Sequence, residues 1–342
     1  EPGSIPVVAG GQKPAFYCNE YNRAGENVTI SSSGCYAGFV MYWDGPIYVS
    51  DAFTAEPNEK ALPKYLYYFL KSKQNIIHSR KRGGGTPHIY ASDIAPIRIP
   101  LPPIKAQREI IYMLDSFCGL IEKLDVEIEA RKKQFGYYCD TLVNSGVDTG
   151  HHELGEVCSH VDYRGRTPKK VSSGVFLITA KNIKKGYIDY ETSKEYIRPE
   201  DYGIVMRRGH PKKGDVVITT EAPCGNVAQI DREGVALGQR VIKYRGGAQI
   251  IDNTFLKYAL LSGGFQNKLL QSATGGQVKG VRASKLHKLK IPVPKLDEQV
   301  KIISCLEKFD SLANIILPYE ARLRREQYVY YRDKLFSFME GL

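Results

Sequence analysis

Two periods of apolar residues divide the chain into alternating regions. Before residue 104, and again between residues 145 and 296, short apolar runs bounded by Gly and Pro predict strands at 27–31, 47–50, 175–179 and 215–220. One amphipathic segment in each region, 63–72 or 253–262, predicts a helix. Strands mixed with short helices predict an α+β class for both regions.

A helical period follows each mixed region. From Ile110 onward, apolar residues recur in alternating steps of four and three, and Arg131 is the single polar position of the stripe. A period of 3.5 is typical of a coiled-coil seam, so we expect two long helices that pair, although each could instead pack on its own globular region. The expected seam positions are Ile110, Leu114, Phe117, Ile121, Leu124, Ile128, Ile302, Leu306, Phe309 and Ile316.

The chain contains an internal repeat. Residues 83–120 match residues 275–312 at a constant offset of 192, and after Leu120 the register moves by one, so that Gln134 matches Gln327. We expect the extra residue to lie near Pro318 and to interrupt the second helix there. The repeat predicts one unit used twice, with mixed regions at 1–104 and 145–296 and long helices at 105–144 and 297–342.

The charge favours a polyanionic partner. The 342 residues include 48 Lys and Arg against 37 Asp and Glu, for a net charge of +11. Basic residues without any acid concentrate at 71–82, 163–185 and 277–290, in segments rich in Gly, Ser, Thr or Pro. Such loops often contact a phosphate backbone, whereas the alternative for any one of them is a solvated surface.

No motif predicts catalysis. Residues 209–214 have the spacing of a phosphate-binding Walker loop, but Asp215 stands where its lysine belongs, and the neighbours His151 and His152 lie in an expected linker. The seven cysteines form no CxxC pair, which argues against a zinc ribbon and a disulfide framework. No segment is apolar enough to span a bilayer, so we expect a cytoplasmic protein. The pattern favours recognition over enzymatic chemistry.

The repeated elements resemble a known family. The pattern Ile-Pro-x-Pro-x-x-x-x-Gln-x-x-Ile-Ile begins at Ile99 and at Ile291, and the related closing segments are 134–142 and 327–335. Both resemble the conserved regions of specificity (S) subunits of type I restriction-modification enzymes. Residues 154–157, 163–168, 178–183 and 236–240 are similar to target recognition domains of that family. The first unit has no counterpart of residues 154–168, so we expect its N-terminal strand and loop to be missing, through truncation or natural shortening.

The resemblance implies an architecture and a function. Two mixed target recognition domains would each be followed by a long helix, and the helices would pair as an antiparallel coiled coil with pseudo-two-fold symmetry. The subunit would recognise an asymmetric bipartite site in double-stranded DNA and dock two methyltransferase subunits, without an active site or a metal of its own. S-adenosylmethionine, ATP and magnesium would belong to the methyltransferase subunits and to the restriction subunits with motor and nuclease activity.

Two sets of residues are candidates for DNA contact. The expected phosphate and base contacts are Arg80, Lys81, Arg82, Arg164, Arg166, Lys169, Lys170, Lys181, Lys279, Arg282 and Lys285, because cations bind phosphates and arginine can also read bases. The candidate base readers are Asn182, Thr220, Gln239, Arg240 and Gln277. For Asn182 and Thr220, hydrogen bonding within a turn or strand end is an equal alternative.

Other interpretations stay open on the sequence alone. The repeated tyrosines Tyr137, Tyr138, Tyr330 and Tyr331 could pack between a helix and a globular region or could hold methyltransferase subunits. The chain could also be the recognition portion of a fused single-chain restriction-methylation enzyme. A third alternative is a helical scaffold whose basic loops bind another acidic partner.

Overall fold

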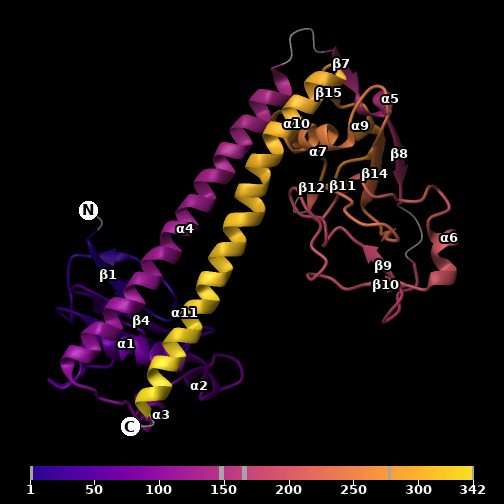
Figure 1. Cartoon of the computed structure of the whole chain (residues 1–342). Helices are drawn as coiled ribbons and strands as arrows, with labels where there is room; N and C mark the ends of the chain where they lie inside the picture. The colour runs from indigo at the N-terminus through magenta and orange to yellow at the C-terminus, as the bar shows by residue number, and fades with distance from the viewer. Residues whose placement is uncertain (1–2, 146–149, 164–167, 276–278, 341–342) are drawn as a thin grey trace. The chain divides into compact units, whose positions relative to one another are not determined.

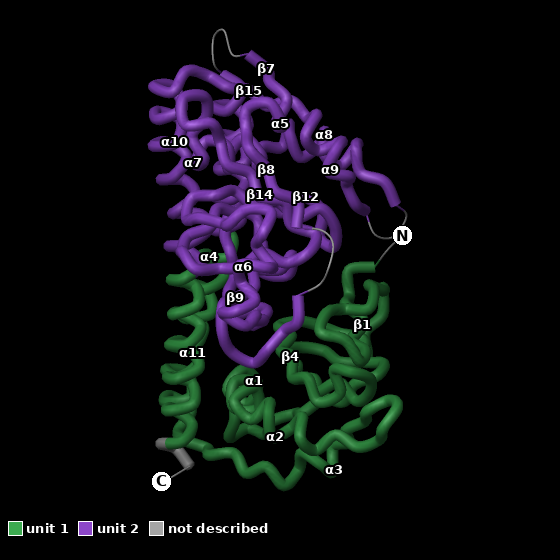
Figure 2. Tube along the Cα trace, turned by 90° about the vertical axis from the view of Figure 1, so that its right-hand side faces the viewer, with its two compact units in different colours: residues 1–126, 319–342 green, residues 127–318 purple. Residues whose placement is uncertain are grey.

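A computed structural model describes residues 3–145, 150–163, 168–275 and 279–340. The chain forms two compact units (Figure 2). Unit 1 comprises residues 1–126 and 319–342, and unit 2 comprises residues 127–318. Each unit therefore contains one mixed region and segments of both long helices.

Unit 1 contains two three-stranded sheets, with strand orders β2-β1-β5 and β4-β3-β6. The strands are β1 (Ile5–Val8), β2 (Tyr17–Cys18), β3 (Asn27–Ser31), β4 (Val40–Trp43), β5 (Tyr48–Val49) and β6 (Ala52–Thr54). The helices are α1 (Pro63–Ser72), α2 (Gln74–Ser79), α3 (Ala91–Ile94), the first part of α4 (Ile104–Asn144) and most of α11 (Leu317–Glu340).

Unit 2 contains a four-stranded sheet, β12-β11-β14-β8, a three-stranded sheet, β10-β9-β13, and the pair β15-β7. The strands are β7 (Gly150–Glu153), β8 (Cys158–Asp162), β9 (Val175–Ile178), β10 (Tyr196–Ile197), β11 (Val216–Thr220), β12 (Cys224–Gln229), β13 (Ala236–Leu237), β14 (Val241–Gly246) and β15 (Lys290–Val293). The helices are α5 (Leu154–Val157), the 3-10 turn η1 (Pro199–Asp201), α6 (Tyr202–Val205), α7 (Asn253–Leu261), α8 (Gly263–Ser272), α9 (Ala283–His287), α10 (Leu296–Ser311) and the π-helical turn η2 (Leu312–Ile316).

The two units repeat one sheet. Strand β3 lies between β4 and β6 in unit 1, as β11 lies between β12 and β14 in unit 2, and every residue of both central strands is buried. Strand β8 adds a fourth strand beside β14, and the described part of unit 1 has no counterpart to it. The expected fold class, two mixed domains each followed by a long helix, is confirmed.

One glutamine in each unit connects the mixed region to the helix that follows it through side-chain hydrogen bonds. The Oε1 of Gln107 accepts from the amide of Leu62 at 2.9 Å, and the Oε1 of Gln299 accepts from the amide of Asp252 at 2.8 Å. Each Nε2 group donates to two backbone carbonyls, and both side chains are completely buried. These residues are the repeated Gln of the Ile-Pro-x-Pro element.

Segments of the two long helices pack side by side in each unit (Figure 1). In unit 1 the ring of Phe117 stacks on Tyr331 with centroids 5.7 Å apart, and Asp125 forms an ion pair with Arg325. Between these two contacts the residue number increases along α4 and decreases along α11, so the two helices are antiparallel, as expected. In unit 2 the equivalent rings, Phe309 and Tyr138, stack at 4.8 Å. The rings of Tyr138 and Tyr331 thus lie against the neighbouring helix, although Tyr331 is still 42% exposed, and Tyr137 and Tyr330 are exposed at 66% and 58%.

Each mixed region is also attached to the end of the other repeat's helix. Phe336 of α11 is buried against Tyr65 and Phe69 of α1, with centroids 5.6 and 5.5 Å apart. Val143 of α4 stands at the matching place in the repeat and is buried in the core of unit 2. Both cores therefore require both long helices.

The second long helix corrects two expectations. Pro318 does not end the helix, because the π-helical turn η2 leads directly into α11. One extra residue in a continuous α-helix would rotate every later side chain by about 100°, and a π turn absorbs that residue. The turn also moves Ile316 out of the seam: its side chain is 52% exposed, and Ala313 and Ala321 are buried instead. The other expected seam positions lie on the buried or half-buried side of their helices.

Candidate nucleic-acid interface

Three loops of unit 2 meet where the central strand β11 ends, and we call this surface edge 2. It comprises residues 220–223 after β11, Gln239 and Arg240 before β14, and residues 279–282. The amide of Thr220 donates to the carbonyl of Arg240 at 2.9 Å, and the amide of Val281 donates to the carbonyl of Thr220 at 3.0 Å. Edge 2 therefore brings together the predicted residues Thr220, Gln239, Arg240, Lys279 and Arg282, although separate segments supply them.

Arg240 occupies an unusual backbone conformation. Its φ is +66°, in the left-handed region where glycine and asparagine are favoured. The side chain is 52% exposed, and its Nε lies 3.6 Å from a carboxylate oxygen of Glu221. A non-glycine residue in this conformation is strained, and such strain concentrates at functional sites, which keeps Arg240 among the candidate base readers.

Unit 1 has the same arrangement, which we call edge 1: residues 32–34, Asp51 and residues 82–88. The amide of Ser32 donates to the carbonyl of Asp51 at 3.3 Å, and the amide of Ile89 donates to the carbonyl of Ser32 at 2.9 Å. The backbones of Arg82 and His88 exchange two hydrogen bonds of 2.8 Å, and those of Thr274 and Gly280 in unit 2 exchange two of 2.8 and 3.0 Å. Edges 1 and 2 are thus built on one backbone plan.

The predicted cations of unit 1 support edge 1. Arg82 forms an ion pair with the buried carboxylate of Asp93, and Arg80 donates to the carbonyl of Asp93 at 2.5 Å. Lys81 donates to the carbonyl of Cys35 at 3.1 Å, in the turn beside Gly34. These contacts hold the loop 82–88 against helix α3, while the side chain of Arg82 remains 68% exposed.

The other predicted cations of unit 2 are exposed around the sheet ends. Lys181 is exposed three residues after β9, whose last residue, Ile178, accepts from the amide of Gly238 at 2.8 Å. Lys285 lies on α9, and Lys170 pairs with Glu195 at 2.7 Å. The predicted residues Arg164, Arg166 and Gln277 lie outside the described residues.

Two predicted base readers are structural residues. Asn182 is completely buried: its Oδ1 accepts from the amide and hydroxyl of Thr179, and its Nδ2 donates to the carbonyls of Asp189 and Ser193. All of these bonds close a turn, so the amide cannot reach a base. Thr220 is 3% exposed and acts through its backbone. For both residues the alternative of hydrogen bonding within the fold was the correct one.

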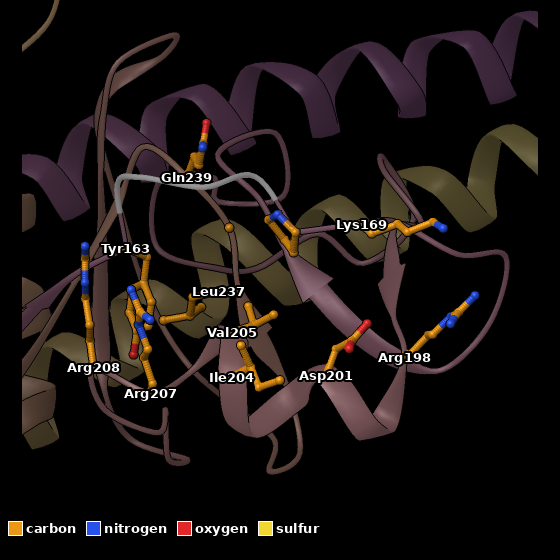
Figure 3. Close-up of a pocket in the computed structure, with 12 residues that line it drawn as sticks. Tyr163, Lys169, Arg198, Asp201, Ile204, Val205, Arg207, Arg208, Leu237 and Gln239 are labelled. Atoms are coloured by element: carbon orange, nitrogen blue, oxygen red, sulfur yellow. The ribbon is translucent and has the colours of Figure 1, made fainter.

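A cavity of about 530 Å³ opens in unit 2 beside Gln239 (Figure 3). Arg207 and Arg208 lie on one side of Ile204 and Val205, and Lys169 and Arg198 lie on the other (Figure 3). All four cations are exposed, and the guanidinium of Arg208 also donates to the carbonyl of Asp162 at 2.9 Å. The cavity is therefore lined by four cations, one carboxylate, that of Asp201, and apolar side chains such as Leu237.

Sequence reasoning missed Arg198, Arg207 and Arg208. The segment 207–213 holds four cations and no acid, so the same charge criterion would have found two of them. This cationic segment overlaps the Walker-like spacing of residues 209–214. Burial raises the pKa of Tyr163, which also lines the cavity, so its hydroxyl stays protonated and donates to the carbonyl of Gly209 at 2.5 Å.

Other classes of site receive no support from the described residues. Within the ranges that the structure covers, no group of three or more His, Cys, Asp or Glu side chains is arranged to hold a metal ion. Of the helices searched over those same ranges, none is long and apolar enough to cross a membrane. The duplicated edges, with their nearby basic residues, are the candidate nucleic-acid interface of the chain.

Comparison with known proteins identifies the family. The family model described as the type I restriction modification DNA specificity domain matches residues 1–130 and 151–318. The chain therefore belongs to the family of type I restriction-modification specificity subunits. It is 32% identical over 315 residues to the EcoR124I/EcoR124II specificity subunit of Escherichia coli, covering 83% of this chain and 73% of that protein.

Further relatives agree with this assignment. The chain is 28% identical to the MjaVIII specificity subunit of Methanocaldococcus jannaschii, covering 92% of this chain and 78% of that protein. The crystal structure of a type I S subunit from M. genitalium aligns over 98% of this chain and 89% of that chain, with a TM-score of 0.57 at 18% identity. The structural likeness concerns the fold alone.

Proposed function

We propose that this chain reads an asymmetric bipartite site in double-stranded DNA for a type I restriction-modification complex and performs no catalytic step itself. The observation that carries the proposal is the duplication of one edge on one backbone plan with different side chains. Two edges that differ in sequence should read two different half-sites. Loops positioned by a rigid sheet are a common place for such recognition.

The proposal includes two methyltransferase subunits as partners. It is supported by a repeated exposed aromatic residue: Tyr137 in unit 2 is 66% exposed, and its equivalent in unit 1, Tyr330, is 58% exposed. Exposed tyrosines at matching places offer one docking position for each copy of a partner, since aromatic residues are enriched at protein interfaces. S-adenosylmethionine, ATP and magnesium would bind to the methyltransferase and restriction subunits.

Mapping methylated adenines tests the proposal. The chain is produced with its methyltransferase in a host without other adenine methylation, and the host genome is sequenced for methylated adenine. We expect one motif with two unlike parts separated by unspecified bases. A palindromic motif, a single continuous motif or no sequence preference would contradict it.

The stoichiometry has its own test. Native mass measurement of the assembled complex should give two methyltransferase subunits for each chain. Tyr137→Ala and Tyr330→Ala should each weaken the binding of one copy, and the double variant should weaken both. Lys301→Ala, at an exposed position of α10, serves as a control that should leave the stoichiometry unchanged.

A further inference from the structure

Asp51 and Arg240 occupy equivalent positions in the two edges. Ser31 of β3 pairs with Ala52 of β6, and Thr219 of β11 pairs with Val241 of β14. The residue immediately before each paired partner is Asp51 in unit 1 and Arg240 in unit 2. The backbone carbonyls of Asp51 and Arg240 accept hydrogen bonds from the amides of Ser32 and Thr220, which are equivalent residues in the repeat. One backbone position therefore carries a negative side chain in one unit and a positive side chain in the other.

The surroundings of Asp51 hold its carboxylate in place. The hydroxyl of Ser32 donates to Oδ1, and the hydroxyl of Ser33 donates to Oδ2. These hydrogen bonds lower the pKa of Asp51, so the side chain is ionised at neutral pH. A carboxylate has about four acceptor positions, which leaves about two available for a ligand. Gly10 passes so close that a Cβ there would lie 3.1 Å from Oδ2.

A negative side chain is unexpected on a protein surface that contacts the phosphate backbone of DNA. A carboxylate repels phosphates, so Asp51 cannot contribute to affinity through the DNA backbone. It can accept a hydrogen bond from an exocyclic amino group in the major groove, and cytosine N4 is the usual partner of Asp and Glu. Arginine at the equivalent place donates two hydrogen bonds to guanine O6 and N7.

We propose that Asp51 is a specificity-determining residue that accepts from the N4 amino group of a cytosine in one half-site, while Arg240 reads a guanine in the other. This inference rests on the proposed function, and it states which chemical groups the two edges recognise. The alternative is that Asp51 only closes the turn 32–34 through its two serine contacts. That alternative predicts no dependence of DNA binding on a cytosine amino group.

Binding to modified duplexes tests the role of Asp51 with the unaltered chain. In the complex with methyltransferase, each cytosine of the recognised site is replaced in turn by 2-pyrimidinone, which lacks the 4-amino group. We expect one position of the unit 1 half-site at which this change weakens binding about ten-fold. For Asp51→Asn the same change should weaken binding less than about two-fold. Absence of any such position in the wild-type protein overturns the inference even if the variant fails to fold.

Methylation motifs give a second measurement. Asp51→Asn should shift one cytosine position toward adenine, because asparagine bonds adenine N6 and N7, and should leave the other half-site unchanged. Arg240→Gln should shift a guanine position toward adenine in the other half-site only. Asp44→Asn removes the same charge at the opposite end of β3, where Trp43 pairs with Asn27, and should leave the motif intact. An unchanged motif in a folded Asp51→Asn complex overturns the inference, whereas a wild-type complex without sequence preference overturns the proposed function first.

Discussion

At the scale of single residues, equivalent positions serve either the fold or recognition. Gln107 and Gln299 have the same hydrogen bonds in both units, because the connection between a mixed region and its helix is identical. Asp51 and Arg240 share a backbone position but differ in charge. Buried repeated residues thus preserve the architecture, while the divergent residues at the edges, half-buried Asp51 and exposed Arg240, are candidates for specificity.

Removing Gln299 tests its structural role. Gln299→Ala removes the hydrogen-bond partner of the Asp252 amide and of two carbonyls at a completely buried side chain, which should cost about 2 to 4 kcal/mol in the free energy of unfolding of unit 2. Hydrogen exchange at the Asp252 amide should accelerate correspondingly. Lys301→Ala, exposed on the same helix, should change neither measurement by more than about 0.5 kcal/mol. Unchanged exchange at Asp252 would contradict the assigned contact.

Lys71 should make the stability of unit 1 depend on pH. Burial, with a smaller effect of Arg332, lowers the pKa of Lys71 from 10.5 to about 8, and its ammonium lies over the ring of Phe39 at 3.8 Å. Between these pH values the unfolded chain binds more protons than the folded one, so stability rises with pH. The unfolding free energy of the wild-type protein minus that of Lys71→Met should therefore rise from pH 8 to 10.5. A difference that stays constant over this range would show that Lys71 titrates normally.

At the scale of elements, the second long helix shows how a repeat tolerates an added residue. The register of the repeat moves by one between Leu312 and Gln327, and η2 begins at Leu312. Because the π turn takes up the additional residue, Tyr331 and Phe336 keep the faces that their equivalents Tyr138 and Val143 have on α4. Pro318 lies two residues beyond the turn, where the missing N–H and the ring would strain a regular helix.

Deleting the additional residue tests this explanation. Removal of Ile316 together with Pro318→Ala should convert η2 into regular α-helix and leave the packing of Phe336 intact. Removal of Arg322 with the same Pro318→Ala change should rotate the following helix by about 100° and unpack Phe336, at a cost of about 3 kcal/mol or more. Thermal unfolding of both variants measures the difference. Equal destabilisation by the two deletions would show that η2 does not compensate for the added residue.

At the scale of the whole molecule, the excess positive charge of +11 is concentrated at particular surfaces. Basic residues lie at edge 2, around the cavity beside α6 and near edge 1. Several of them also hold their own loops, as Arg82 and Arg80 do with Asp93. Contacts to phosphates give affinity without sequence information, so this charge should supply most of the salt dependence of DNA binding.

Salt dependence tests whether the cavity rim contacts DNA. Arg207→Ala should weaken the binding of specific and random duplexes alike and should reduce the slope of log K against log salt by about 1. Arg322→Ala removes the same charge from an exposed position of α11, outside both edges and the cavity, and should leave the slope unchanged. The assignment fails if Arg207→Ala binds as the wild-type protein does at every salt concentration.

Much of the architecture could be predicted from periodicity. The strands 27–31 and 215–220 and the helix 63–72 were predicted within one residue of β3, β11 and α1 because their apolar patterns are regular. Contacts between distant segments could not be predicted in this way. Asn182 and Arg240 both looked like polar loop residues, yet one is buried in a closed turn and the other is exposed at a strained position.

The sequence by itself determined the repeat, the two mixed regions, the helical seam and the family, because these depend on spacing along the chain. Only the tertiary structure decided which loops meet at each edge, where Ile316 lies and which cations line the cavity. The physical reason is that burial and hydrogen bonding depend on residues far apart in sequence. Asp51 shows this directly, because its relation to Arg240 follows from strand pairing and not from any similarity between the two side chains.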